Sequence, residues 1–285
     1  MMDRIHRESR SINAIGMPMS LNSNPGSAIA RPRAPFWGID GCRGGWLVVE
    51  CGTDRRFRAT ARVCRTIGEL TDRLPGVPLA LIDIPIGLTD APGGVRKCDE
   101  VARAMLGPRR SSVFFPIVRQ ALSARTYAEA CAVQKALCGK KPSIQSWNIT
   151  PRIREVEAFL QQRPGCRKRL RESHPELCFR ELNGGRPLTA SKRTPEGVQQ
   201  RLSLLAHCSK NARSFFEHTR GTYPRSQVAD DDIIDAMVLA LHAAMSHSCG
   251  LVSIPDPAEF NRAGEMMEIV FADISFSQRY KPRTG

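Results

Sequence analysis

Apolar positions in the first part of the chain fall into short runs that are typical of β-strands. Residues 36–40 and 79–85 are apolar runs with an aspartate at or near their end, and residues 46–51 form a further run. Residues 57–65 alternate loosely between apolar and polar positions. A turn with three glycines, residues 41–45, separates the first two runs. The pattern predicts three antiparallel strands followed by a buried parallel strand.

Helical patterns fill most of the rest of the chain. Thr66 followed by Glu69 forms a capping box, which predicts a short helix that ends at Pro75-Gly76. Apolar periodicity and capping residues predict further helices over residues 95–106, 126–138, 151–162, 194–206 and 230–246. A fifth strand is predicted over residues 172–179. Strands and helices in this order predict an α/β fold.

The composition changes along the chain and suggests its organisation. Residues 1–35 contain scattered Ser, Asn, Gly, Pro and Arg without a structural period, so we expect a disordered basic leader without a catalytic role. We expect residues 36–278 to form a single domain with a helical insertion at about residues 94–165. Residues 279–285 are expected to be a frayed tail.

The overall composition narrows the class of protein. Hydrophobic residues make up 41% and charged residues 25% of the 285 residues, which excludes a purely disordered or fibrous chain. No apolar run approaches the ~18 residues of a membrane span, so we expect no membrane partner. The ten cysteines include no CxxC pair and follow no secretory signal, which indicates reduced thiols and a cytoplasmic location. The net charge of +14 favours a phosphate-bearing or otherwise acidic partner.

Five acidic residues stand out by their context. Asp40 and Asp83 each lie at the end of an apolar strand, and Glu176 lies in a His-Pro-Glu motif within the predicted fifth strand. Asp232 and Asp235 are three positions apart at the start of the last long helix. A role as turn residue or helix cap explains most of these acids without any chemistry. Asp235 is different, because an acid within an apolar helix is unfavourable unless it is paired or bound to a metal.

Acids on separate rigid elements are what hard divalent cations require. Mg²⁺ and Mn²⁺ prefer carboxylate oxygens, and water and substrate phosphate complete their coordination. Two such ions ~3.5–4 Å apart promote the hydrolysis of phosphodiester bonds. The spacing of Asp232 and Asp235 places both on one face of the helix. The sequence therefore supports a site in which Asp40, Asp83, Asp232 and Asp235 bind Mg²⁺ or Mn²⁺ and Glu176 assists.

Several ordered and well-separated motifs carry a resemblance to a known family. They are FWGIDGCRGGW at residues 36–46, IDIPIGL at 82–88, RKCD at 96–99 with Ala102 and Arg103, LGPRR at 106–110, SHPELCF at 173–179, LNGGRPL at 182–188 and SKRT at 191–194. Over roughly residues 36–246 they resemble a bacterial family of uncharacterised proteins, domain of unknown function 429. That family is described as predicted nucleases of the ribonuclease H-like superfamily.

The resemblance implies a fold, an activity and a set of site residues. The fold is a mixed five-stranded sheet, three antiparallel strands and then parallel strands, with helices on both faces. The superfamily pattern implies an acid at the end of the first strand, matched by Asp40, and one on the fourth strand. Asp83 matches the second acid, although many superfamily nucleases carry Glu there. The last helix resembles that of Holliday-junction resolvases, whose acid-x-x-acid-Ala pattern falls on residues 232–236.

Basic residues near the predicted site are candidates for contact with nucleic-acid phosphates. Arg43 has the strongest claim, because it lies in the glycine turn beside Asp40. The other candidates are Arg96, Arg103, Arg109, Arg110 and Lys192. A solvated charged face explains each of these clusters equally well.

Three functions fit the sequence, and they differ in what happens to the phosphate. The leading hypothesis is a metal-dependent nuclease, with DNA or RNA as its substrate. The second is a module on the same scaffold that binds nucleic acid without cleaving it. The third is a relative of actin-like kinases, whose phosphate loops pair an Asp with glycines; it ranks lowest because the chain has one such hairpin. Many superfamily nucleases are dimers, which leaves a homodimer open, although the sequence shows no dimer seam.

Overall fold

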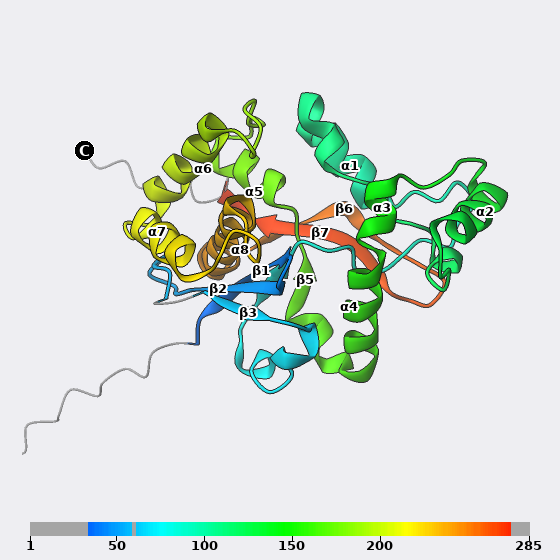
Figure 1. Ribbon diagram of the computed structural model, residues 1–285, viewed down its shortest axis with the longest axis horizontal. Coiled ribbons are helices and arrows are strands. Elements are labelled where there is room, and N and C mark those ends of the chain that lie inside the picture. Colours follow the sequence, from blue (N-terminus) through cyan, green and yellow to red (C-terminus); the bar gives the residue numbers. More distant parts are fainter. Residues whose placement is uncertain (1–33, 59–60, 275–285) are drawn as a thin grey trace, which may run out of the picture. The chain divides into compact units, whose positions relative to one another are not determined.

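The fold is built on a mixed five-stranded sheet. The structure is a computed structural model that describes residues 34–58 and 61–274. The sheet strands are β1 (Phe36–Cys42), β2 (Gly45–Cys51), β3 (Arg62–Cys64), β4 (Ala80–Ile82) and β5 (Leu170–Glu172), in the spatial order β3-β2-β1-β4-β5 (Figure 1). β1, β2 and β3 pair antiparallel, whereas β4 pairs parallel with both β1 and β5. The predicted α/β fold with three antiparallel strands followed by parallel strands is therefore confirmed.

Eight α-helices within the described residues complete the fold. They are α1 (Lys97–Leu106), α2 (Tyr127–Cys138), α3 (Ile144–Asn148), α4 (Thr150–Gln162), α5 (Pro175–Leu182), α6 (Pro195–Cys208), α7 (Ala212–Thr222) and α8 (Asp230–Cys249). Short 3₁₀ helices lie at Ile67–Leu70, Leu74–Gly76, Gly107–Ser112, Arg119–Ala121 and Pro164–Lys168. Helices α1 to α4 all lie between β4 and β5 in the chain, where the sequence predicted a helical insertion.

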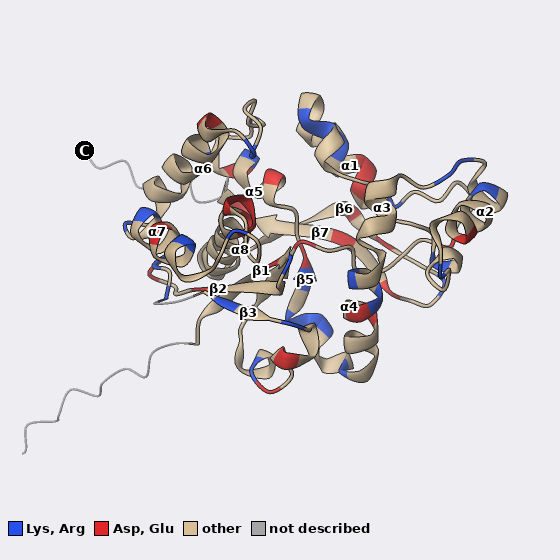
Figure 2. Ribbon diagram, viewed as in Figure 1, with Lys and Arg blue, Asp and Glu red and all other residues tan. Residues whose placement is uncertain are grey.

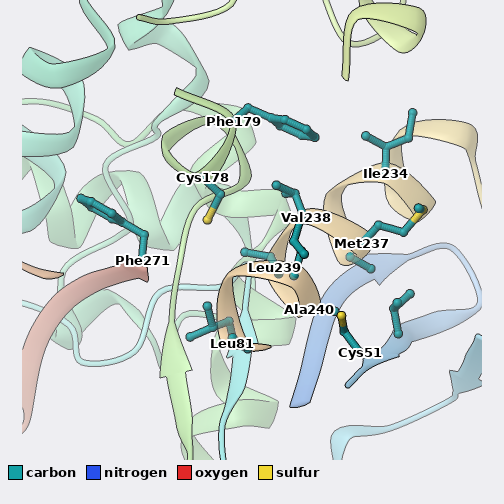
Figure 3. Close-up of a cluster of buried hydrophobic side chains, with 14 of the residues drawn as sticks. Cys51, Leu81, Cys178, Phe179, Ile234, Met237, Val238, Leu239, Ala240 and Phe271 are labelled. Carbon is teal, nitrogen blue, oxygen red and sulfur yellow. The ribbon is translucent and has the colours of Figure 1, made fainter. Parts of the chain in front are cut away.

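Helix α8 covers one face of the sheet and α4 packs on the other. Apolar residues of α8, including Val238, are fully buried with Leu81 of β4 and Phe271 (Figure 3). On the opposite face, apolar residues of α4 pack with Trp37 and Ile39 of β1. Burial on both faces explains why β1 and β4 read as continuous apolar runs in the sequence.

Two segments fold differently from their sequence predictions. The strand predicted over residues 172–179 ends at Glu172, and the helix α5 begins at Pro175. Proline suits the first position of a helix, because it lacks the N–H that this position leaves unpaired. Leu177, Cys178 and Phe179 are buried on this helix, and a short apolar run does not by itself distinguish strand from helix. Similarly, the helix predicted after Thr66 consists of two 3₁₀ turns.

The structure also contains elements that the sequence patterns did not predict. These are α3, α7 and a hairpin of β6 (Leu251–Phe260) and β7 (Met266–Ala272), which forms a separate two-stranded sheet. The predicted third strand is shorter than expected and covers only residues 62–64. The predicted leader lies outside the described residues except for 34–35, and the tail over 279–285 lies outside them entirely. None of the helices in the described residues has the length and apolar character needed to cross a membrane.

Candidate active site

Asp40 and Asp83 lie side by side on neighbouring strands. The parallel register of β1 and β4 pairs Ile39 with Ile82, and the backbone N–H of Asp83 donates to the Ile39 carbonyl at 3.0 Å. Asp40 and Asp83 directly follow the paired residues Ile39 and Ile82. Because successive side chains of a strand alternate between the two faces of a sheet, both aspartates point to the face opposite Ile39 and Ile82. That face is the one covered by α8. Oδ1 of Asp40 also accepts a hydrogen bond from the Gly41 N–H at 2.8 Å.

Helix α8 brings Asp235 to the same place. The helix backbone lies directly against Gly38 of β1, where an added Cβ would be 2.1 Å from the Ala236 carbonyl oxygen and 2.2 Å from the Ala240 nitrogen. Asp235 is adjacent to this contact and is only 1% exposed. The sequence therefore correctly marked Asp235 as unusual, because a buried acid on a packed helix needs a partner.

The pKa values of these carboxyls show that the acids act on one another. Burial, and then the charges of Asp83 and Asp235, raise the pKa of Asp40 well above its usual value. Burial also raises the pKa of Asp83, and the charge of Glu176 adds to the effect. Burial raises the pKa of Asp235 to about 6, with Asp83 and Glu176 contributing. Four acids from β1, the end of β4, α5 and α8 thus form one electrostatic cluster, which we call the acid cluster (Asp40, Asp83, Glu176 and Asp235).

Lys192 is a cation in direct contact with this cluster. Its Nζ donates to Oδ2 of Asp235 at 2.5 Å and lies 3.8 Å from Oδ2 of Asp231. The charge of Asp235 above all, with help from Asp40 and Asp83, raises the pKa of Lys192, so the ammonium stays protonated. Oδ1 of Asp235 is buried and has no hydrogen-bond partner among the described residues.

Glu176 has its own cationic partner. It lies in the first turn of α5 and is 4% exposed, and its Oε1 accepts a hydrogen bond from Nη2 of Arg201 at 2.6 Å. Arg201 is fully buried on α6 and lies over the Phe179 ring. Within the described residues, Oε2 of Glu176 is buried without a hydrogen-bond partner. Arg201 was not predicted as a site residue, although a charged residue on the apolar face of α6 is unusual enough to have identified it.

Asp232 is placed differently from the other predicted acids. Its Oδ2 accepts a hydrogen bond from the Ala229 N–H at 2.8 Å, which caps the first turn of α8. This turn also carries Asp230 and Asp231 and forms an acidic helix start (red at α8 in Figure 2). The position favours carboxylates because of the helix dipole. The structure therefore gives Asp232 the capping role that the sequence left open, beside the acid cluster.

Three members of the acid cluster, all except Asp40, line a cavity of about 490 Å³. Asp83, Glu176, Asp235 and Lys192 line one part of it. The segment that follows α1 lines another part with Arg109, Ser111, Ser112 and Phe114, and Arg193 also contributes. Acids, cations and hydroxyl groups therefore face the same space, which is the chemistry that a phosphate-bearing ligand requires.

The predicted basic residues fall into three groups. Arg96, Arg109 and Lys192 line the cavity, whereas Arg43 and Arg110 are exposed and do not line it. Arg103 donates to the carbonyls of residues 110 and 113, so it holds the segment that follows α1.

Arg96 does not have the exposed position expected of a phosphate contact. It is 0% exposed, and its guanidinium forms paired hydrogen bonds to both Asp99 and Glu172. Its Nη1 also donates to the carbonyls of residues 86 and 87. With all its nitrogens engaged, Arg96 joins the start of α1 to the end of β5, which is a structural role.

Two more residues near the site use their side chains to contact the backbone. Nη2 of Arg152 on α4 donates to the Cys42 carbonyl, and its guanidinium lies 5.7 Å from the Trp46 ring. It therefore places a positive charge beside the β1–β2 turn. His174 is the N-cap of α5: its Nδ1 accepts from the Glu176 N–H at 3.2 Å, and its Nε2 lies 3.3 Å from the Ser112 carbonyl oxygen. Both ring nitrogens of His174 thus contact the backbone, which is a structural role.

The carboxylate oxygens of the acid cluster are ligands that a hard cation prefers, but they do not form a complete coordination site. Its donors are all carboxylate oxygens, two of them buried without a partner, and a cation would relieve the repulsion among the acids. However, no group of three or more Asp, Glu, His or Cys side chains within residues 34–58 and 61–274 is arranged to hold a metal ion. Of the four predicted ligands, Asp232 caps its helix and Asp235 pairs with Lys192. Asp40 and Asp83 are the adjacent pair that remains.

Comparisons with known proteins identify the family of the chain but no individual relative. No curated protein and no solved structure matches it. A family match covers residues 38–260, which runs from within β1 to the end of β6 and includes the whole acid cluster. The chain therefore belongs to the family described as Protein of unknown function (DUF429).

Proposed function

We propose that this protein is a metal-dependent nuclease that hydrolyses phosphodiester bonds in nucleic acid. One observation carries the proposal: Asp40, Asp83 and Asp235, which are far apart in the chain, meet beside a cavity that is also lined by cations. Nucleases need carboxylates to hold a hard cation and positive charge to accept the polyanion, and this site offers both.

The roles follow from the position of each side chain. Asp40 and Asp83 would hold Mg²⁺ or Mn²⁺, which supplies an activated water and stabilises the leaving oxygen when it is bound. Lys192, Arg109 and Arg193 are positioned to bind phosphate oxygens, and Arg201 orients Glu176 through its hydrogen bond to Oε1. The cavity has the size of a small-ligand site, so we infer that a single nucleotide unit, and not a whole duplex, enters it.

A second function, the binding of nucleic acid without cleavage, has one specific observation in its favour. Lys192 already neutralises Asp235, and the described residues contain no completed metal site. A protein of this fold whose acids have only structural roles would also show Asp235 paired with Lys192 and no complete metal site. All ten cysteines are free thiols, which fits either function in a reducing compartment such as the cytoplasm.

The test is an assay of the purified full chain on a panel of DNA and RNA substrates with Mg²⁺ or Mn²⁺. The panel should include single strands, duplexes, ends and junctions, because the sequence does not select among them. We expect the wild type to cleave at least one substrate and Asp40→Asn to lose that activity. Asp72→Asn is the matched control, because Asp72 is an exposed aspartate away from the site. Binding without cleavage by folded wild type would favour the second function.

A further inference from the structure

Lys192 is fixed by the backbone around it. It precedes α6, whose N-cap Thr194 accepts a hydrogen bond from the Gly197 N–H at 3.2 Å. The N–H and hydroxyl of Thr194 both donate to the Ser191 carbonyl, at 3.1 and 2.9 Å. Gly197 packs so closely on this carbonyl that an added Cβ would be 1.8 Å from its oxygen. The position of Lys192 is therefore set by the start of α6.

The ammonium of Lys192 occupies the place where a second metal ion would bind α8. Among the described residues, Asp235 is the only acid of α8 that lines the cavity, and Nζ of Lys192 is 2.5 Å from its Oδ2. A divalent ion on the same oxygen would face a fixed positive charge at contact distance, which is strongly unfavourable. Asp232, the other predicted ligand on this helix, already accepts the Ala229 N–H.

The same ammonium also faces the cavity. A lysine ammonium has three donors, and the hydrogen bond to Asp235 uses one of them. Lys192 is 35% exposed and lines the cavity, so its other donors are available to an anionic oxygen there. It can therefore give a phosphate the positive charge that a second metal ion would otherwise give.

We propose that Lys192 replaces the second metal ion, so that the site holds one divalent cation, on the side of Asp40 and Asp83. This inference rests on the proposed function, because it assigns the cations of that same site. It replaces the two-ion arrangement that the sequence suggested with one divalent ion and one fixed ammonium. Asp235 is then the residue that positions Lys192, and it is not a metal ligand.

The number of Mn²⁺ ions bound per chain tests this proposal without any substrate. Mn²⁺ binding to the purified full chain is measured by electron paramagnetic resonance of free Mn²⁺ and by titration calorimetry. We expect one ion per wild-type chain, loss of that ion in Asp40→Asn, and retention of one ion in Asp235→Asn with less than about a threefold change in Kd. We expect Lys192→Met to gain a second binding event, because both oxygens of Asp235 become free.

Arg193→Met is the matched control for Lys192→Met. It removes the same charge from the adjacent residue, which also lines the cavity but has no contact with Asp235, so it should still bind one ion. Circular dichroism spectra show which variants are folded. Two ions on the wild type, or loss of the single ion in Asp235→Asn, would overturn the proposal.

The outcomes also separate this inference from the proposed function. Two bound ions together with cleavage would leave the nuclease proposal standing and remove the role of Lys192. One bound ion without cleavage of any substrate would support the role of Lys192 and overturn the nuclease activity. A wild-type chain that binds no Mn²⁺ would overturn both.

Discussion

The contact between Gly38 and α8 controls both stability and the assembly of the acid cluster. A Cβ at this position would lie 2.1 Å from the Ala236 carbonyl oxygen, 2.2 Å from the Ala240 nitrogen and 2.9 Å from the Ala240 Cα. All three are backbone atoms, so no side chain can turn away to make room. Restoring an ordinary contact of about 3.4 Å requires α8 and β1 to separate by roughly 1.3 Å.

Gly38→Ala is therefore expected to destabilise the protein and to disrupt the site. Overpacking of this kind typically costs 1–3 kcal/mol, and we expect about 3 kcal/mol because a whole buried helix must move. The same shift would draw Asp235, and Lys192 paired with it, away from Asp40 and Asp83, so any nuclease activity should fall, whereas Mn²⁺ binding on Asp40 and Asp83 should change little. The loss of activity should exceed what the unfolded fraction explains.

Urea unfolding measured by tryptophan fluorescence gives the free energy of unfolding of Gly38→Ala and wild type. Trp37 and Trp46 are buried in the sheet, so their emission reports its unfolding. The control is Gly221→Ala in α7, where an added Cβ meets nothing within 4 Å, and which we expect to be neutral or stabilising by up to about 1 kcal/mol. A Gly38→Ala variant within about 0.5 kcal/mol of wild type would refute the close contact between β1 and α8.

Three further predictions concern buried charges. His242 is fully buried between the Cys178 carbonyl and the Ala272 N–H, and burial lowers its pKa to about 4 from an ordinary 6.5. Below pH 6.5 the unfolded chain binds the proton first, so His242 should reduce the free energy of unfolding by about 3 kcal/mol as the pH falls from 6.5 to 4. Chemical denaturation across this range should show a greater loss of stability with falling pH in wild type than in His242→Gln, because the difference between the two isolates the histidine; equal slopes would contradict the assignment. Arg201→Met removes the nearer of the two cations at the buried Glu176 carboxylate and leaves Arg109, 4.0 Å from Oε1. We expect a loss of about 3 kcal/mol in urea unfolding, whereas a loss below about 1 kcal/mol would show that the pair is not buried as described. Because burial and neighbouring acids raise the pKa of Asp40, Asp40→Asn should raise the Tm at pH 7 while it removes Mn²⁺ binding, and a lower Tm would contradict the mutual repulsion in the acid cluster.

The sequence predicted the sheet well because its strands are buried on both faces. The runs that became β1 and β4 are continuous and apolar, and an aspartate that follows such a run lies at the end of a strand. This is why the sequence alone could predict that Asp40 and Asp83 lie close together. The turn from β5 into α5 was not predictable in the same way, because three residues form the strand and Pro175 then starts a helix within the same apolar stretch.

The ion pairs of the site were beyond prediction because they join distant parts of the chain. Lys192 was identified as basic, but its pairing with Asp235, 43 positions later, depends on how α6 and α8 pack. Arg201 and Glu176 are separated by 25 positions and meet for the same reason. Arg96 illustrates the opposite error, because a charged residue read as a surface contact is fully buried between two acids.

The central claim is that Asp40 and Asp83 hold one divalent cation beside an ammonium fixed on Asp235. Anomalous diffraction from crystals of the full chain grown with Mn²⁺ tests it most directly. The account predicts a single strong peak in coordination contact with Asp40 and Asp83, with Lys192 still on Asp235. A peak elsewhere, a second ion on Asp235, or carboxyl groups that point into separate regions would contradict it.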